Sequence, residues 1–276
     1  MKAFTARSLS AQFRLAAASL CCAFAAFSAS AADTPAPAMS AKDLAARLAA
    51  LQQDGASYVR LRLDATGATK IALQIQIKQR RTKTASEIIY QILWPKERKG
   101  EGVLLRKIGD RPATGAIFRP PDTVRALDAD QMKEPLFGSD LTCEDIIENF
   151  FTWDNQAIVG AETVDRVNCQ VLESKPGKGQ RFSYASVRTW VDTRRTVPMR
   201  VEKYSASGEL LRRIDSTRIV SEDHRHIPAN LSVSGRRKDS ITELDGSRIV
   251  HDVAFTDRDF TPDALRELTT PKSAPK

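Results

Sequence analysis

The stretch KIALQIQIKQR, residues 70–80, decides the fold class of this chain. Apolar and polar residues alternate along it with a period of two, which predicts a β-strand with one buried face. The segment ASEIIYQILWP, residues 85–95, alternates in the same way. We therefore expect two adjacent strands whose apolar side chains line one face: Ile71, Leu73, Ile75, Ile77, Ile88, Tyr90, Ile92 and Trp94.

Short segments of the same kind fill most of the remaining chain. YVRLRLD, residues 58–64, precedes the deciding stretch, and others continue to residue 256, separated by Gly, Pro and charged clusters. About a dozen such segments with few helices predict a mainly β protein. Because sheets of more than about ten strands usually curl, split or close, we expect one strongly curved antiparallel sheet.

Helical patterns are few. Ser40 and Asp43 resemble a capping box at the start of the amphipathic segment SAKDLAARLAALQQ. Thr142 and Asp145 form the same pattern in the middle of the chain, before an apolar run. A short helical turn is expected at 262–268, because a threonine and a proline stand at its start. These helices would cover the curved sheet.

A curved sheet covered by helices can enclose a cavity for an acyl chain. Phe137 and Phe150 flank the middle helix, so they join the eight strand residues above as candidate ligand-binding residues. A tightly packed core explains the same apolar residues, and the alternation alone favours that core. The sequence leaves both interpretations open.

The beginning of the chain predicts export. Lys2, Arg7 and Arg14 precede the apolar run Leu15–Phe27, and the small residues Ala-Ser-Ala follow it. This order is typical of a secretory signal peptide. The expected organisation is a signal peptide over 1–31, a Pro-rich linker over 32–40, one domain over 41–268 and a disordered tail over 269–276.

The charge balance is mildly basic. Cleavage of the signal removes three basic residues and lowers the net charge from +8 to +5. Nucleic-acid binding would conflict with export, so we expect no nucleic-acid partner. Basic pairs at predicted strand ends make peripheral contact with an anionic membrane possible, although ordinary solvated strand ends are the favoured explanation.

Two cysteines remain after the predicted cleavage, Cys143 and Cys169. An even pair in an exported protein favours a disulfide. The alternative is two buried, reduced cysteines that act as small hydrophobic residues.

The common catalytic motifs are absent from the sequence: it contains no GxSxG, GxxxxGK[ST], GxGxxG or HExxH pattern. His224 and His226 stand two residues apart, and a metal-dependent hydrolase built on them is conceivable. They lie at a predicted turn, where exposed histidines are common. We therefore expect no catalytic residues, no bound metal and no cofactor.

Several motifs resemble one known family. The segment FGSDLTCEDI, residues 137–146, resembles the GSD-[LF]-[ST]-x-ED signature of the LolA-like outer-membrane lipoprotein-sorting proteins. YASVRTWVDTRRTVPMRVEKYSASGELLRRI, residues 184–214, resembles a later part of that family, in which a strand ending in Trp-Val-Asp precedes a Pro-containing strand and a Gly-turn hairpin. The resemblance spans roughly residues 42–268.

The resemblance implies an unclosed β-barrel with covering helices, in a periplasmic protein that shields the acyl chains of lipids or lipoproteins. An inner-membrane exporter and an outer-membrane acceptor would then be its partners. A second function implied by the superfamily is an RseB-like envelope sensor on the same fold. We expect Ser139, Asp140, Glu144 and Asp145 to be structural, because the motif would form a turn and a helix N-cap.

Overall fold

The computed structural model describes residues 39–52, 55–67, 69–180, 182–222, 225–235, 237 and 239–270. The predicted signal peptide and most of the predicted linker lie outside these residues, as does His224. One compact unit begins at Met39 and contains all the elements below.

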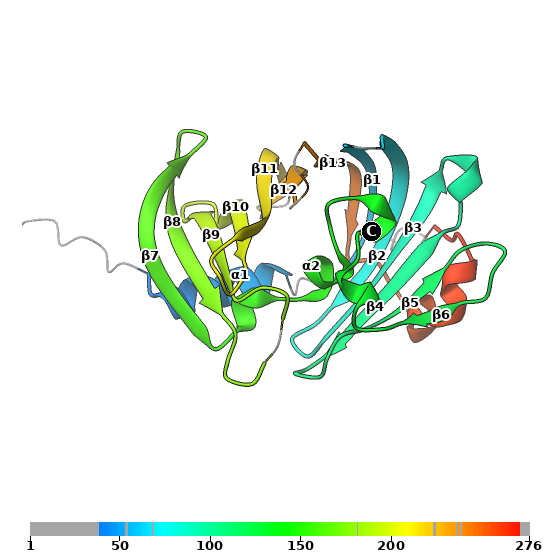
Figure 1. Ribbon diagram of the computed structural model, residues 1–276, viewed down its shortest axis with the longest axis horizontal. Helices are drawn as coiled ribbons and strands as arrows, with labels where there is room; N and C mark the ends of the chain where they lie inside the picture. The colour runs from blue at the N-terminus through cyan, green and yellow to red at the C-terminus, as the bar shows by residue number, and fades with distance from the viewer. Residues whose placement is uncertain are drawn as a thin grey trace, which may run out of the picture. The chain divides into compact units, whose positions relative to one another are not determined.

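Thirteen antiparallel strands of the described chain form one sheet in the order β6-β5-β4-β3-β2-β1-β13-β12-β11-β10-β9-β8-β7 (Figure 1). The sheet curves, and β6 and β7 are its two edges, so the barrel is unclosed. The predicted fold class is confirmed. The strands are β1 Gly55–Thr66, β2 Ile71–Arg81, β3 Ala85–Trp94, β4 Gly102–Ile108, β5 Thr114–Phe118, β6 Arg125–Leu127, β7 Asn155–Val164, β8 Val167–Lys175, β9 Ser186–Asp192, β10 Val197–Tyr204, β11 Leu210–Glu222, β12 Arg225–Ser234 and β13 Ile241–His251.

The chain returns to its first strand at the end of the sheet. All neighbours but one are consecutive in sequence, and the exception is the pairing of β1 with β13. Tyr58 pairs with Val250 and Leu63 with Leu244, so the N-terminal and C-terminal strands lie side by side in the middle of the sheet. This pairing places the inner faces of β1, β2, β12 and β13 next to one another.

Two α-helices occur in the described chain, and both begin where the sequence predicts. In α1, Ala41–Gln52, the amide of Asp43 donates to Ser40 Oγ at 3.1 Å. In α2, Cys143–Ile147, Thr142 and Asp145 form a reciprocal capping box. Short 3-10 turns cover Lys96–Arg98, Gln131–Lys133, Leu136–Gly138, Phe150–Thr152, Asp257–Phe260 and Pro262–Arg266, the last of which is the predicted turn.

Apolar contacts hold both α-helices against the inner face of the sheet. On the inner face, Ile75 and Ile88 pack in one core cluster with Ile147 of α2. Leu44 of α1 packs in another cluster that includes Leu172 of β8. These contacts fix the helices over the concave side of the sheet.

The C-terminal segment covers the outer face of β2 and β3. Gln91 Nε2 donates to the backbone oxygens of Leu265 and Glu267, each at 3.1 Å, and Lys78 Nζ donates to Thr269 Oγ1 at 2.5 Å. Gln91 and Lys78 are consequently buried. Thr269, the first residue of the predicted tail, thus contacts β2 through Lys78.

Trp94 does not share the apolar face of its strand, so that prediction is wrong. Ile75 pairs with Ile92, but the next pair is Gln74 with Trp94, which leaves Leu93 as an extra residue in β3. Such a bulge reverses the alternation of side chains beyond it. The side chain of Trp94 lies 53% exposed on the outer face, beside Arg62 and Gln74.

The predicted disulfide is also wrong, because Cys143 and Cys169 are both free and buried. Cys143 belongs to the inner core cluster of β1–β4. Cys169 packs with Val171 and Trp190 in a separate cluster of β8–β10. The neighbouring Leu172 and Val191 instead pack against α1, so Cys169 lies on the outer face and the sheet separates it from Cys143. The alternative of two reduced cysteines describes the structure.

Candidate functional site

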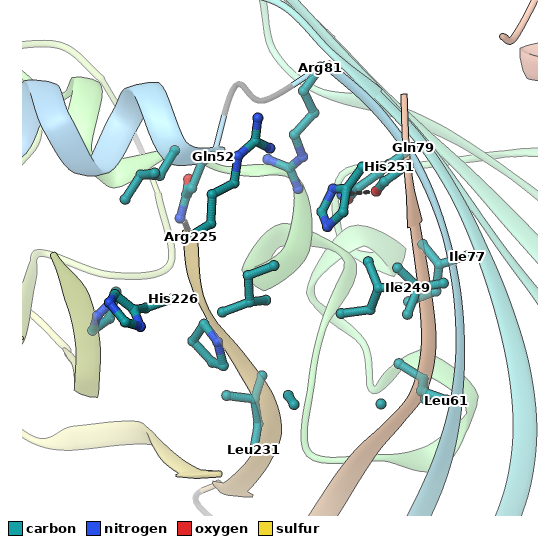
Figure 2. Close-up of a pocket in the computed structure, with 18 of the residues that line it drawn as sticks. Gln52, Leu61, Ile77, Gln79, Arg81, Arg225, His226, Leu231, Ile249 and His251 are labelled. Atoms are coloured by element: carbon teal, nitrogen blue, oxygen red, sulfur yellow. Dashed lines mark hydrogen bonds between the residues drawn. The ribbon is translucent and has the colours of Figure 1, made fainter. Parts of the chain in front are cut away.

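A cavity of about 440 Å³ lies on the inner face of the sheet. Its walls are apolar and come from strands at both ends of the chain: Val59, Leu61, Ile77, Leu231, Leu244 and Ile249 (Figure 2). Leu48 and Leu51 of α1 and Phe151 also line it. The volume lies within the roughly 300–1,000 Å³ typical of small-molecule sites.

The mouth of the cavity is polar and basic. Gln79 and Arg81 continue the inner face of β2 beyond Ile77, because side chains two residues apart share a face. Arg225 lies across the mouth on β12, and His251 ends β13 (Figure 2). Gln79 Nε2 donates to Ser57 Oγ at 2.7 Å, which fixes the amide at the rim. The site thus joins an apolar interior to a cationic entrance.

Arg81 connects this entrance to α2. Its Nη2 donates a hydrogen bond of 3.0 Å to the backbone oxygen of Ile146, near the C-terminal end of α2. Burial lowers the pKa of the Arg81 guanidinium, because removal from water disfavours the charged form, although nearby Tyr90 opposes the shift. The side chain remains a cation at neutral pH.

The segment 137–147, which we call the plug segment, is tied to the sheet at one end by Asp140. The buried Asp140 carboxylate accepts hydrogen bonds from Ser240 Oγ at 2.8 Å and from Thr242 Oγ1 at 2.9 Å. Gly138 has a φ of +86°, and a Cβ there would lie 2.6 Å from Ile71 Cδ1. The positive φ is the reason that glycine is favoured at this position, since the Ile71 methyl group at the end of its side chain could move aside.

The other end of the plug segment is tied by Asp145. Lys203 Nζ of β10 lies 2.7 Å and Arg212 Nε of β11 lies 2.9 Å from its carboxylate oxygens, and the Tyr184 hydroxyl donates to it at 2.5 Å. Burial alone would raise the pKa of Asp145, but the two cations bring it below its usual value. Glu144 accepts a bond of 2.8 Å from the amide of Ser183.

The structural roles predicted for the motif are therefore confirmed. Asp140, Glu144 and Asp145 bind other parts of the protein, and Ser139 Oγ accepts from the amide of Leu141 at 3.2 Å. Because Asp140 contacts the β12–β13 side and Asp145 contacts β10 and β11, the motif holds one covering segment against two regions of the sheet.

The structure divides the predicted ligand-binding residues. Ile77 and Tyr90 line the cavity. Phe150 packs beside α1, and Trp94 lies outside. The others pack in or against the inner core cluster under the plug segment: Ile71, Leu73, Ile75, Ile88, Ile92 and Phe137. Packed core and cavity are thus both present, on adjacent parts of one face.

Sequence reasoning missed most of the cavity wall. Val59 and Leu61 belong to a strand that the alternation identified, but Leu231, Leu244 and Ile249 become their neighbours only through the pairing of β1 with β13. No local signal in the sequence indicates that pairing. The missed mouth residues Arg81 and Arg225 are also brought together by the topology of the sheet.

Nothing in the described chain forms a metal centre: no three His, Cys, Asp or Glu side chains gather there as a metal ion would require. His226 lines the cavity and its Nδ1 lies 2.9 Å from Ser221 Oγ. His224, the second histidine of the conceivable metal pair, lies outside the described residues. None of the described helices is long and apolar enough to cross a membrane.

Solved structures share this fold. A DUF1329 family protein from Desulfovibrio piger ATCC 29098 is 21% identical with a TM-score of 0.76, over 82% of this chain and 97% of that chain. A domain described as an outer membrane lipoprotein-sorting protein, from Vibrio parahaemolyticus, is 17% identical with a TM-score of 0.74, over 82% and 98%. A LolA superfamily protein from Nitrosomonas europaea is 20% identical with a TM-score of 0.65, over 82% and 100%.

The fold is therefore LolA-like, as the resemblance of the sequence implied. A family model described only as "-like: Uncharacterized protein" matches residues 84–267, more than half of the chain. The chain belongs to that family. No protein with curated annotation matches the sequence.

Proposed function

We propose that this protein is a non-enzymatic carrier or chaperone that shields an acyl chain of a lipid or lipoprotein in the inner-face cavity. The single observation that carries the proposal is the apolar cavity of about 440 Å³, lined by the inner face of the curved sheet and by α1. The LolA-superfamily fold supports it, because the matched Vibrio domain is described as a lipoprotein-sorting protein.

Burial would supply the binding free energy. Each methylene group removed from water contributes about 0.8 kcal/mol, so a chain of several methylene groups binds measurably even after its conformational entropy is lost. Release then requires either an acceptor of comparable affinity or a movement of the covering helices. Leu48 and Leu51 of α1 face the cavity, so α1 is the element whose displacement would open it.

The proposal places the protein in the periplasm, between an inner-membrane exporter and an outer-membrane acceptor. The order of charge, apolar run and small residues at the beginning of the sequence supports export. The superfamily fold agrees with such a location. Peripheral contact with an anionic membrane would accompany the transfer step.

A cavity-filling variant tests the proposal. Leu244→Trp places a larger side chain in the cavity wall, and Ile158→Trp makes the same kind of change on the exposed edge strand β7. We expect Leu244→Trp to weaken binding of a fluorescent fatty-acid probe at least about tenfold and Ile158→Trp to leave it unchanged. Thermal unfolding checks that both variants fold. A folded Leu244→Trp protein that binds like the wild type would refute the proposal.

A further inference from the structure

The cavity joins an apolar interior to a basic mouth. This arrangement complements an amphiphile that has an apolar chain and an anionic headgroup. We infer that the mouth is a subsite for an anionic headgroup, a carboxylate or a phosphate, whose acyl chain lies in the cavity. The inference rests on the proposed function and specifies the ligand class. The site would bind lipids with an anionic headgroup in preference to neutral lipids.

The first observation behind the subsite is the environment of Arg81. It is partly buried at the mouth, and its guanidinium donates a hydrogen bond to the neutral backbone oxygen of Ile146. Among the described residues, no carboxylate forms an ion pair with it. Burying a cation costs free energy unless an anion compensates the charge, and burial lowers the pKa of this guanidinium accordingly. A bound anion would supply that compensation.

The second observation is that another arginine, Arg225, lines the same mouth. It reaches the mouth from β12, whereas Arg81 comes from β2, and Figure 2 shows both side chains extending into the entrance. Strands β1 and β13 lie between these two strands, so the curvature of the sheet brings the arginines to one opening. A guanidinium donates two parallel hydrogen bonds to a carboxylate or phosphate. Two of them facing one entrance suit an anion with several oxygen atoms.

The remaining lining supports the same ligand. Gln79 and His251 add polar groups at the mouth, and the described residues that line the cavity include no aspartate or glutamate. The charged side chains among these described lining residues, Arg81 and Arg225, are both cationic, and cations attract anions. Further inside, Leu61, Leu231 and Ile249 offer only apolar contacts, so a charged headgroup is favoured at the entrance over this part of the cavity.

Three lipids with the same acyl chain test this subsite. Palmitate, palmitoyl lysophosphatidate and neutral monopalmitoylglycerol are compared below their critical micelle concentrations by displacement of a fluorescent fatty-acid probe. We expect at least one anionic lipid to bind about tenfold more tightly than the neutral one, because charged hydrogen bonds add to chain burial. A preference for palmitate identifies a carboxylate, and a preference for lysophosphatidate identifies a phosphate.

Arg81→Gln and Arg225→Gln should each lower the ratio of the affinity for the preferred anionic lipid to the affinity for monopalmitoylglycerol, from about tenfold toward one. Arg62→Gln is the matched control, since Arg62 is an exposed arginine outside the cavity. If Arg81→Gln fails to fold because its bond to α2 is lost, Arg225→Gln still decides the question.

The outcomes separate this inference from the proposed function. If all three lipids bind equally and Leu244→Trp blocks all of them, the carrier function stands and the headgroup subsite is refuted. An anionic preference that both glutamine variants retain also refutes the subsite. If none of the lipids binds the wild-type protein, the subsite and the proposed function fail together.

Discussion

Asp145 carries a buried negative charge between two cations. Its side chain is 0% exposed, and those of Lys203 and Arg212 are 3% and 12% exposed. Asp145→Asn leaves both cations without their shared counter-charge, so we expect a loss of about 3 to 5 kcal/mol in the free energy of unfolding. Urea denaturation measures this loss. Asp130→Asn, at a side chain that is 94% exposed, is the control and should unfold like the wild type.

The same carboxylate predicts an acid-sensitive fold. Lys203 and Arg212 hold the pKa of Asp145 below its usual value, so its stabilising contribution is complete above the unfolded pKa, near 4, and is lost as the pH falls through the folded pKa. The free energy of unfolding should therefore decrease more steeply below pH 4 in the wild type than in Asp145→Asn. Parallel pH profiles for the two proteins would contradict this role.

The two free cysteines give a covalent prediction. Burial raises the pKa of the Cys143 thiol to about 12, and it raises the pKa of Cys169 as well. Thiolate is the reactive form, so iodoacetamide should modify neither residue in the native protein and both after urea unfolding. Mass spectrometry of the digested, unreduced protein measures which of the two cysteines carries the iodoacetamide adduct. A Cys143–Cys169 linked peptide in freshly purified protein would show that a disulfide forms.

At the scale of elements, the plug segment is the part of the fold that depends most on specific polar contacts. Asp140→Ala removes the acceptor for Ser240 and Thr242, and we expect a loss of about 2 kcal/mol and faster amide hydrogen exchange throughout residues 138–147. Asp263→Ala, at a side chain that is 91% exposed, is the control. Unchanged exchange in the plug segment of Asp140→Ala would show that apolar packing alone holds it.

Local patterns predicted the elements well, because they depend on neighbouring residues. The capping pairs Ser40–Asp43 and Thr142–Asp145 start α1 and α2 as expected. The alternation identified β2 and β3, but it could not reveal the bulge at Leu93 that turns Trp94 outward. Nor could it show that the C-terminal segment covers Gln91.

At the scale of the whole molecule, the site depends on contacts that are distant in sequence. The pairing of β1 with β13 joins the two ends of the domain, and the cavity wall forms along that seam. The sequence therefore predicted an apolar inner face and left open whether it held a cavity or a core. Both are present. The plug segment packs against the inner face of β1–β4, and the cavity lies along the part of the inner face that α1 lines.

The central claim is that the cavity holds an acyl chain. Native mass spectrometry and lipid extraction of protein purified from a periplasmic fraction test it most directly, with Leu244→Trp as the comparison. We predict a co-purified lipid or acylated peptide on the wild-type protein, at much lower occupancy on the filled variant. A wild-type protein that has the mass of the chain alone, and that takes up no added lipid, would contradict the account.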